Sequence, residues 1–332
     1  MLDVRRLRLL RELARRGTIA AVAEALAFSP SAVSQQLGVL EREAGLPLLE
    51  RTGRRVRLTP AGQNLVRHAD AVLERLEQAD ADLAEARGGL AGALRIGAFP
   101  TATRAIVPAA LVALARRHPG LEPMVCETDP AVVAHALRAG DLDVALVHVY
   151  DLVPAAREPG LATEPLYGEA MYLAAPAGEP PRATPDPDPA PDGGQAPDER
   201  PAPGQDAAAD QGAVLRTHAD DPWITATPGT LCHAMTVRAC RAAGFTPRVR
   251  HQVDEFATVL ALVAAGQGVA VVPQLGITEP AEPAVRLTRL RMQRRTQLAF
   301  RSGAARHPAV AAFGAALRAS VPPDLAGSHA AE

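Results

Sequence analysis

The 332-residue sequence has only three cysteines and no stretch of apolar residues as long as a membrane span. Cys126, Cys232 and Cys240 are too few and too irregularly spaced for a disulfide framework or a zinc motif, so we expect no metal and no other cofactor. The N-terminus is charged and lacks the apolar core and small-residue cleavage site of a secretory signal. We therefore expect a cytoplasmic protein with no membrane partner.

The sequence also lacks the common motifs of catalysis. It has no glycine-rich phosphate loop, no G-x-S-x-G turn and no paired metal motif, which counts against an enzyme. Lysine is absent as well: all 35 basic residues are arginine. Because alanine is abundant, we attribute this bias to a GC-rich genome rather than to selection for bidentate contacts. The missing signal also counts against a transport-type solute-binding protein.

Charge is unevenly distributed along the chain. The net charge is only −2, but residues 1–60 hold eleven arginines against six acidic residues. A local excess of positive charge indicates a polyanionic partner such as nucleic acid.

The first 59 residues have the pattern of three helices and a hairpin. Residues 2–16 are amphipathic and stop at Gly17, Thr18 is a suitable N-cap for a second helix, and Ser29 with Pro30 begins a third that runs to about residue 43. Two helices joined by a short turn have helix-turn-helix geometry. The following run LLERTGRRVRLT, residues 48–59, predicts a hairpin, or wing, that carries four arginines.

The third helix has two distinct faces. Val33, Leu37 and Leu40 form an apolar face, while Ser31, Ser34 and Gln35 lie on another. A glutamine can pair bidentately with adenine and serine hydroxyls are permissive, so this face can read bases; an ordinary solvated helix face is the alternative. The expected DNA-binding residues are Thr18, Ser29, Pro30, Ser31, Ser34, Gln35 and the wing arginines Arg51, Arg54, Arg55 and Arg57, the last four contacting phosphates or the minor groove.

A long helix is predicted over residues 60–88. Apolar residues recur in it at spacings of four and three, which is the pattern of a helix that packs against a partner helix. This dimerisation seam comprises Leu65, Ala69, Val72, Leu76, Ala79 and Leu83. Because a dimer relates two recognition helices by a two-fold axis, we expect a partly palindromic double-stranded DNA site.

From residue 92 onward, short strands alternate with helices, which indicates α/β units arranged in two lobes. The expected strands are 94–98, 122–127, 144–149, 170–175, 223–226, 248–253 and 268–272, with helices near 230–243 and 254–265. Residues 176–212 contain ten prolines and few large apolar side chains, so we predict a disordered surface insertion; an acidic interaction tail is the alternative.

The stretch AAVAEALAFSPSAVSQQLGVLEREAGLPLLERTGRRVRLTPAG, followed later by LRIGAF, HPGLE, AGDLDVAL and GQGVAVVP, resembles the LysR-type transcriptional regulators. The resemblance implies a fold of α+β and α/β class: a winged helix-turn-helix at 1–59, a linker helix at 60–88, and a two-lobed effector domain like the periplasmic binding proteins. Lobe 1 is expected at 92–163 plus about 273–320, lobe 2 at 164–272, and a tail at 321–332.

The same resemblance implies a DNA-binding transcriptional regulator whose activity responds to a small-molecule effector, assembled as a homodimer or as a tetramer of two dimers. Many members of that family carry arginine after the recognition-helix serine, where this chain has Gln35. An α/β enzyme, or a cytoplasmic small-molecule-binding protein, with a fused DNA-binding domain remains an alternative.

Effectors of two-lobed α/β folds bind where strands end and helices begin. We expect a carboxylate or other anionic metabolite there, although threonines at helix starts are also common structural caps. Cys232, beside His233, raises a thiol-sensor or metal hypothesis, against the alternative of a small apolar side chain. The expected effector-binding residues, which match the inducer-binding turns of the family, are Pro100, Thr101, Ala102, Thr103, Thr128, His148, Thr227, Pro228, Thr230 and Asp254.

Overall fold

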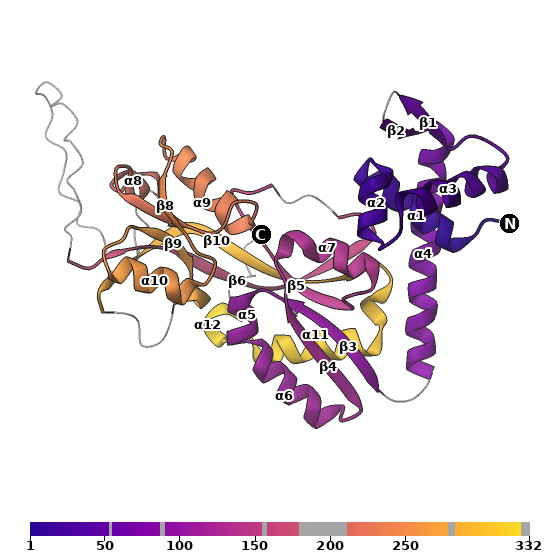
Figure 1. Cartoon of the computed structure of the whole chain (residues 1–332). Coiled ribbons are helices and arrows are strands. Elements are labelled where there is room, and N and C mark those ends of the chain that lie inside the picture. The colour runs from indigo at the N-terminus through magenta and orange to yellow at the C-terminus, as the bar shows by residue number, and fades with distance from the viewer. Residues whose placement is uncertain (53–54, 87–89, 155–157, 179–210, 278–282, 327–332) are drawn as a thin grey trace, which may run out of the picture.

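The computed structural model describes residues 1–52, 55–86, 90–154, 158–178, 211–277 and 283–326 (Figure 1). Its N-terminal domain contains the three expected helices, α1 (Val4–Arg16), α2 (Ile19–Ala25) and α3 (Pro30–Ala44). The α1 helix ends at Gly17, whose φ of 72° is the left-handed conformation that glycine adopts without strain. Leu10, Val22, Leu37 and Leu40 are buried where the three helices meet. The helix-turn-helix prediction is confirmed.

The wing and the long helix follow directly. Strands β1 (Leu49–Thr52) and β2 (Arg55–Leu58) pair antiparallel, and α4 runs from Pro60 to Ala86. Gly62, in the first turn of α4, is close-packed: a Cβ there would lie 2.2 Å from the carbonyl oxygen of Leu48. This contact fixes where the long helix leaves the N-terminal domain.

One sheet of six strands runs through both lobes, in the order β4-β3-β5-β10-β6-β9. Parallel strands β3 (Gly92–Ala98), β4 (Leu121–Glu127) and β5 (Val144–Tyr150) form one side, and the antiparallel strands β6 (Leu161–Pro176), β9 (Ala270–Pro273) and β10 (Val285–Arg301) form the other. A separate parallel pair, β7 (Pro222–Thr225) and β8 (Arg248–Gln252), joins it through a bridge between Trp223 and Val269.

Helices cover the sheet in two groups, which define the lobes (Figure 1). Lobe 1 holds β3–β5 with α5 (Pro100–Ala105), α6 (Val107–Arg117), α7 (Pro130–Ala139) and α11 (Pro308–Ser320); lobe 2 holds β7–β9 with α8 (Gln211–Arg216), α9 (Leu231–Ala242) and α10 (Phe256–Ala264). Ile96 and Phe313 are buried in the first core and Trp223 in the second. Short helices η1 (Gln274–Gly276), η2 (Ala304–Arg306) and α12 (Pro323–Ala326) complete the chain.

Each of the seven strands expected from the sequence is present within two residues of its expected ends or as part of a longer strand. The long strand β10 was not expected as a strand, and it does not belong to lobe 1 alone. Its first residues, Val285–Arg289, pair with the end of β6 beside β9, and its last residues pair with β5. Part of the tail predicted at 321–332 is packed against the domain, because Leu325 of α12 is buried in the core of lobe 1.

The N-terminal domain and the linker helix contact lobe 1 through polar groups. Nη2 of Arg16 lies 2.7 Å from Nδ1 of His135 on α7, and Nε of Arg301 on β10 lies 2.8 Å from a carboxylate oxygen of Glu77 on α4. The end of β10 is thereby attached to the linker helix.

The predicted insertion at 176–212 falls almost entirely outside the described residues, between the end of β6 at Pro176 and the start of α8 at Gln211. Among the described residues no helix combines the length and the apolar content that a bilayer span requires.

Candidate functional site

The α3 helix presents a polar face to solvent. Ser29 caps it by accepting a hydrogen bond from the backbone N–H of Ala32, and Pro30 occupies its first turn. Ser31 and Gln35 are exposed and Ser34 is half-buried, while the opposite face is in the core. Ser29 and Thr18, which caps α2 in the same manner, act as caps, and the hydroxyl of Ser31 lies 3.0 Å from that of Ser29. Ser31 and Gln35 are the exposed residues among the three polar side chains predicted to read bases.

The wing arginines lie on or next to the hairpin. Arg51 and Arg55 are in β1 and β2, and Arg57 of β2 is exposed. Arg54 lies outside the described residues. A basic hairpin beside an exposed polar helix is the arrangement with which winged helix-turn-helix proteins contact DNA.

The predicted seam of α4 divides into two parts. Ala69 is fully buried against α1, in the core of its own N-terminal domain, and Leu65 packs against the same core. Further along, Val72, Leu76 and Leu83 are 39%, 45% and 56% exposed, and Ala79 is exposed as well. The apolar face left uncovered is thus the part of α4 beyond Ala69.

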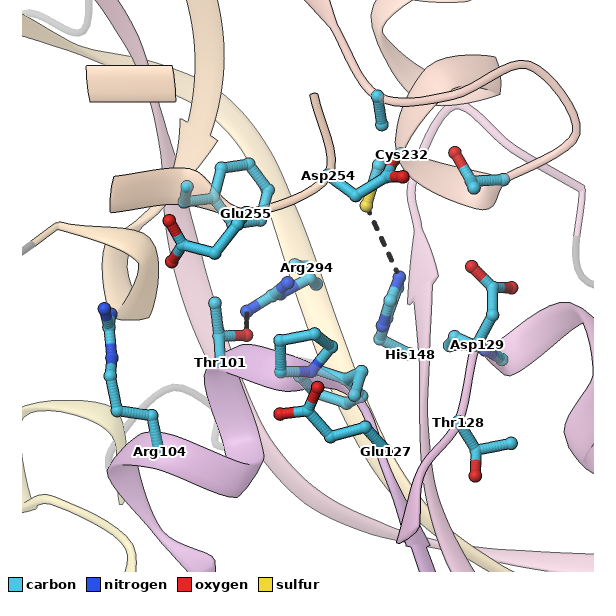
Figure 2. A pocket seen from close by; sticks show the side chains of 16 residues that line it. Thr101, Arg104, Glu127, Thr128, Asp129, His148, Cys232, Asp254, Glu255 and Arg294 are labelled. Carbon is cyan, nitrogen blue, oxygen red and sulfur yellow. Dashed lines mark hydrogen bonds between the residues drawn. The ribbon is translucent and has the colours of Figure 1, made fainter. Parts of the chain in front are cut away.

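A cavity of about 280 Å³ lies between the two lobes (Figure 2). Lobe 1 contributes the turn after β3 and the turn after β4, and lobe 2 contributes the turns before α9 and α10. The residues lining the cavity are Phe99, Pro100, Thr101, Arg104, Glu127, Thr128, Asp129, Pro130, His148, Ala226, Thr230, Cys232, Asp254, Glu255, Phe256 and Arg294.

The floor of this cleft is a buried ion pair. Arg294 of β10 is only 1% exposed; its Nε donates to a carboxylate oxygen of Glu169 at 2.8 Å, and its Nη2 donates to Oγ1 of Thr101 at 2.8 Å (Figure 2). Burial is the largest single influence on the pKa of Arg294 and lowers it, but the combined effect of Glu169, Tyr150, Tyr167 and Cys232 raises it. The guanidinium is therefore charged, and its charge is already balanced inside the protein.

Three further side chains form the wall above this pair. The hydroxyl of Tyr150 lies 3.1 Å from Sγ of Cys232, and Nε2 of His148 lies 4.0 Å from the same sulfur (Figure 2). Burial, together with the charge of Arg294, holds the pKa of His148 well below its usual value, so the imidazole is neutral. Burial raises the pKa of the Cys232 thiol, and Arg294 opposes the shift without overcoming it. A helix N-terminus usually lowers the pKa of a thiol, but burial dominates at Cys232.

Six of the ten residues expected at the effector site line the cavity. They are Pro100, Thr101, Thr128, His148, Thr230 and Asp254.

The other four do not line the cavity. Ala102 is fully buried. Thr103 donates its hydroxyl to the backbone oxygens of Ala98 and Phe99, so it faces its own turn. The turn at Thr227 and Pro228 lies behind Asp254, whose two carboxylate oxygens accept hydrogen bonds from the Thr227 N–H and hydroxyl at 2.8 Å each.

Asp254 also differs from its predicted position as the start of a helix. The cap of α10 is Glu255, which accepts a hydrogen bond from the N–H of Thr258. Asp254 instead ties two loops of lobe 2 together at the edge of the cleft.

Three residues at or below the floor of the cleft were not expected from the sequence. Arg294, Glu169 and Tyr150 were not expected at the site, although all three contact one another or the residues around the cavity. A signal was present in the sequence: Leu290 and Met292, and then Leu298 and Phe300, recur at every second position, which is the period of a strand. In the structure the even-numbered residues from 290 to 300 are all buried in β10.

Two family profiles match the chain. Residues 4–63 match the bacterial regulatory helix-turn-helix protein, lysR family, and residues 87–192 and 202–322 match the LysR substrate binding domain. Together they cover the N-terminal domain and both lobes.

Curated relatives agree with these profiles. A probable hydrogen peroxide-inducible genes activator of Mycobacterium avium is 31% identical over 86% of this chain and 83% of its own length. The regulator TfdS of Cupriavidus pinatubonensis is 31% identical over 82% of each chain. A further probable hydrogen peroxide-inducible genes activator, from Mycobacterium xenopi, is 41% identical over 48% of this chain and 81% of its own length.

Solved structures give the same result. A cysteine mutant of OxyR from Corynebacterium glutamicum, with H2O2 bound, is 26% identical, with a TM-score of 0.54 over 96% of this chain and 92% of that one. These relatives are regulators of transcription rather than enzymes. The exposed helix, the basic wing and the two-lobed domain around a cleft thus have one explanation: the chain belongs to the LysR family of DNA-binding transcriptional regulators, in which an effector-binding domain controls transcription.

Proposed function

We propose that the protein acts in the cytoplasm as a homodimer, or as a pair of dimers, that reads a partly palindromic promoter site through α3. The observation that carries this proposal is the exposed face of Ser31 and Gln35 on a helix whose other face is fixed in the core. Arg51, Arg54, Arg55 and Arg57 contact phosphates or the minor groove and set the affinity, while Gln35 contributes base preference. The exposed part of α4 pairs the two copies.

The cleft between the lobes is the proposed effector site. Its floor and the linker helix are connected by one strand, because β10 carries both Arg294 in the cleft and Arg301, which pairs with Glu77 of α4. These residues are seven apart, or about 24 Å along an extended strand. A ligand that shifts β10 at the cleft therefore acts on the helix that positions the DNA-binding domains.

The proposal is tested by footprinting the full-length protein on its own upstream region with and without candidate small molecules. We expect a footprint that weakens steeply with salt, since phosphate contacts release counterions, and that changes in extent when an effector is added. Binding that is absent, or insensitive to salt, would contradict the DNA-binding part of the proposal. An unchanged footprint across all ligand classes would contradict the effector part alone.

Gln35→Ala is expected to relax base preference without weakening binding to all sequences equally. A bidentate contact discriminates against the wrong base by about 1–3 kcal/mol, so the variant should lose about tenfold or more at one adenine of each half-site. Selection of binding sites from a random library measures this directly. The matched control is Arg57→Ala on the wing, for which we expect a similar loss at every sequence and a shallower salt dependence. If Gln35→Ala selects the same binding sites as the wild-type protein, Gln35 does not contribute to base recognition.

A second candidate for the signal is peroxide, because several relatives are named as hydrogen peroxide-inducible activators and Cys232 lies in the cleft wall beside Tyr150. In that reaction the thiolate sulfur attacks one peroxide oxygen, the O–O bond breaks, hydroxide leaves and the sulfur becomes a sulfenic acid. The raised pKa of Cys232 keeps the thiol protonated at neutral pH, so the reaction should be slow there and accelerate as the pH rises.

The variant Cys232→Ser distinguishes peroxide from a bound metabolite as the signal. If peroxide is the signal, the variant loses its peroxide-induced change of footprint and keeps basal DNA binding, while Cys126→Ser, at an exposed position, behaves as the wild type. If a bound metabolite is the signal, the footprint of the wild-type protein does not respond to peroxide. Trapping of the sulfenic acid, followed by mass spectrometry of the modified peptide, identifies the reacting cysteine.

A further inference from the structure

The charges around the cleft do not suit an anion. Of the two arginines that line it, Arg294 is neutralised by Glu169. Arg104 donates to the backbone oxygen of Leu275 and interacts with Glu255. For Glu255, burial alone raises the pKa, but hydrogen bonds from Thr258 and the charge of Arg104 lower it, so this carboxylate is ionised. Once these pairs are set aside, Glu127, Asp129 and Asp254 remain without a cation among the lining residues.

The helix N-termini at the cleft led us to expect an anion from the sequence. Their positive charge is too small to cancel the excess of carboxylates around the cleft. Oδ1 of Asp129 accepts from the N–H of Ala131 and caps α7. A helix N-terminus contributes only about half a positive charge, whereas Glu127 and Asp129 contribute a full negative charge each. The lobe 1 wall is therefore negative even at the helix start.

The two lobes place their carboxylates around one point. Asp129 from lobe 1 and Asp254 from lobe 2 line the same cavity as Cys232 (Figure 2). Burial is the main reason that the pKa of the Cys232 thiol is raised, Arg294 lowers it, and the two carboxylates add smaller upward effects. Asp129 accepts a hydrogen bond from Ala131 and Asp254 accepts two from Thr227, so each carboxylate is held in place by its own lobe.

A neutral acceptor is available at the same place. His148 is 3% exposed and its side chain lies along the cavity (Figure 2). Its Nδ1 is buried without a hydrogen-bond partner among the described residues. A buried polar atom left without a partner is costly. In the tautomer whose Nε2–H faces the Cys232 sulfur, Nδ1 is an acceptor, so a ligand that donates a hydrogen bond stabilises this site.

From this arrangement we propose that the cleft binds a small molecule with a positively charged amine or guanidine group, held between Asp129 and Asp254 with His148 as a hydrogen-bond acceptor. This inference rests on the proposed effector site and names the class of its ligand. It replaces the anionic metabolite expected from the helix starts.

The placement also gives the ligand a way to change the protein. Carboxylates on opposite lobes repel one another across the cleft, and a cation between them converts repulsion to attraction. Binding therefore favours a closer approach of the lobes, and does so in proportion to the ligand charge.

The sign of the cleft potential is measurable without knowing the ligand. In a Cys126→Ser/Cys240→Ser background, Cys232 is reacted with two methanethiosulfonates of similar size, one carrying a trimethylammonium group and the other a sulfonate. The thiol forms a mixed disulfide, methanesulfinate leaves and a proton is released. With each rate divided by that for free 2-mercaptoethanol, we expect the cationic reagent to be favoured by about tenfold or more.

Neutralising variants locate the charge. Asp129→Asn, which retains a capping oxygen, and Glu127→Gln should each lower the ratio by about fivefold. Glu122→Gln is the matched control, because Glu122 is exposed on the same strand β4 but lies outside the cavity lining; it should leave the ratio nearly unchanged.

A ratio of one or below would overturn the proposal. So would failure of the cationic reagent to reach Cys232, since the ligand has to reach the same place. The experiment involves no DNA, so a high ratio together with a footprint that ignores every ligand would refute the regulatory role of the site and leave its charge preference standing.

Discussion

Glu169→Gln is expected to lower the free energy of unfolding of the effector domain by about 3–5 kcal/mol, the largest effect of any single side chain that we consider. Glu169 and Arg294 are both almost completely buried, and removing one partner leaves an unpaired charge in a region from which water is excluded. Glu169 also accepts from the backbone N–H of Leu275 at 2.9 Å, so the same change weakens the connection to η1. Chemical denaturation, monitored by the fluorescence of the single tryptophan Trp223 in lobe 2, measures the loss.

Glu164→Gln provides the matched comparison. Glu164 lies on the same strand β6 and pairs with Arg318, but both side chains are more than 40% exposed. Exposed pairs contribute about 0–1 kcal/mol, so this variant should unfold almost as the wild type does. Equal effects of the two changes would show that burial of the Glu169–Arg294 pair is unimportant.

A double variant distinguishes charge from packing. In Glu169→Leu/Arg294→Met neither charge remains, and replacement of a whole buried pair by apolar groups is often neutral for stability. We therefore expect most of the stability to return, while any response to the effector is lost together with the polar floor of the cleft.

Leu76→Glu is expected to abolish the dimer and to reduce affinity for a two-half-site promoter by about a hundredfold or more. Leu76 is 45% exposed in the single chain and lies midway along the uncovered face of α4, so a carboxylate there would be buried against its symmetry mate. Loss of the second DNA-binding domain removes the gain from binding two half-sites at once. Analytical ultracentrifugation gives the assembly state, and footprinting gives the affinity.

The control for this experiment is Ala71→Glu, which adds the same charge at an exposed position of α4 outside the predicted seam. It should leave both assembly and affinity unchanged. If the Leu76→Glu variant remains dimeric, the dimer interface does not lie on this face of α4. The exposed apolar residues of α4 then have another role.

The N-terminal domain was predictable because its signals are local. Ser29 with Pro30 and the glycine after α1 mark helix ends within a few residues of sequence, and their capping needs no distant partner. The seam was predicted only in part, since spacing does not reveal what covers a helix face. Ala69 fits the repeat as well as Leu76 does, yet it is covered by α1 of its own chain.

The cleft was less predictable because its key contacts are distant in sequence. Arg294 and Glu169 are 125 residues apart, and the strand that carries Arg294 is so rich in arginine that its alternation resembles an exposed surface. Six of the ten expected residues line the cavity, but which threonine faces it depends on side-chain direction. Thr101 accepts a hydrogen bond from Arg294, whereas Thr103, two residues later, donates to the backbone oxygen of Phe99.

The sheet that runs through both lobes constrains how they can move. The chain crosses between the lobes in β6 and in β10, and these strands are paired with each other along most of their length. Their pairing is irregular between Arg289 and Gln293 and again between Thr296 and Gln297, and Arg294 is the cross-strand neighbour of Glu169 between these two points. Bulges are where a paired ribbon bends and twists most readily. The two lobes are therefore joined by a ribbon that its own buried ion pair holds together, and we expect any closure of the lobes to be a twist of this ribbon rather than a swing on loose connections.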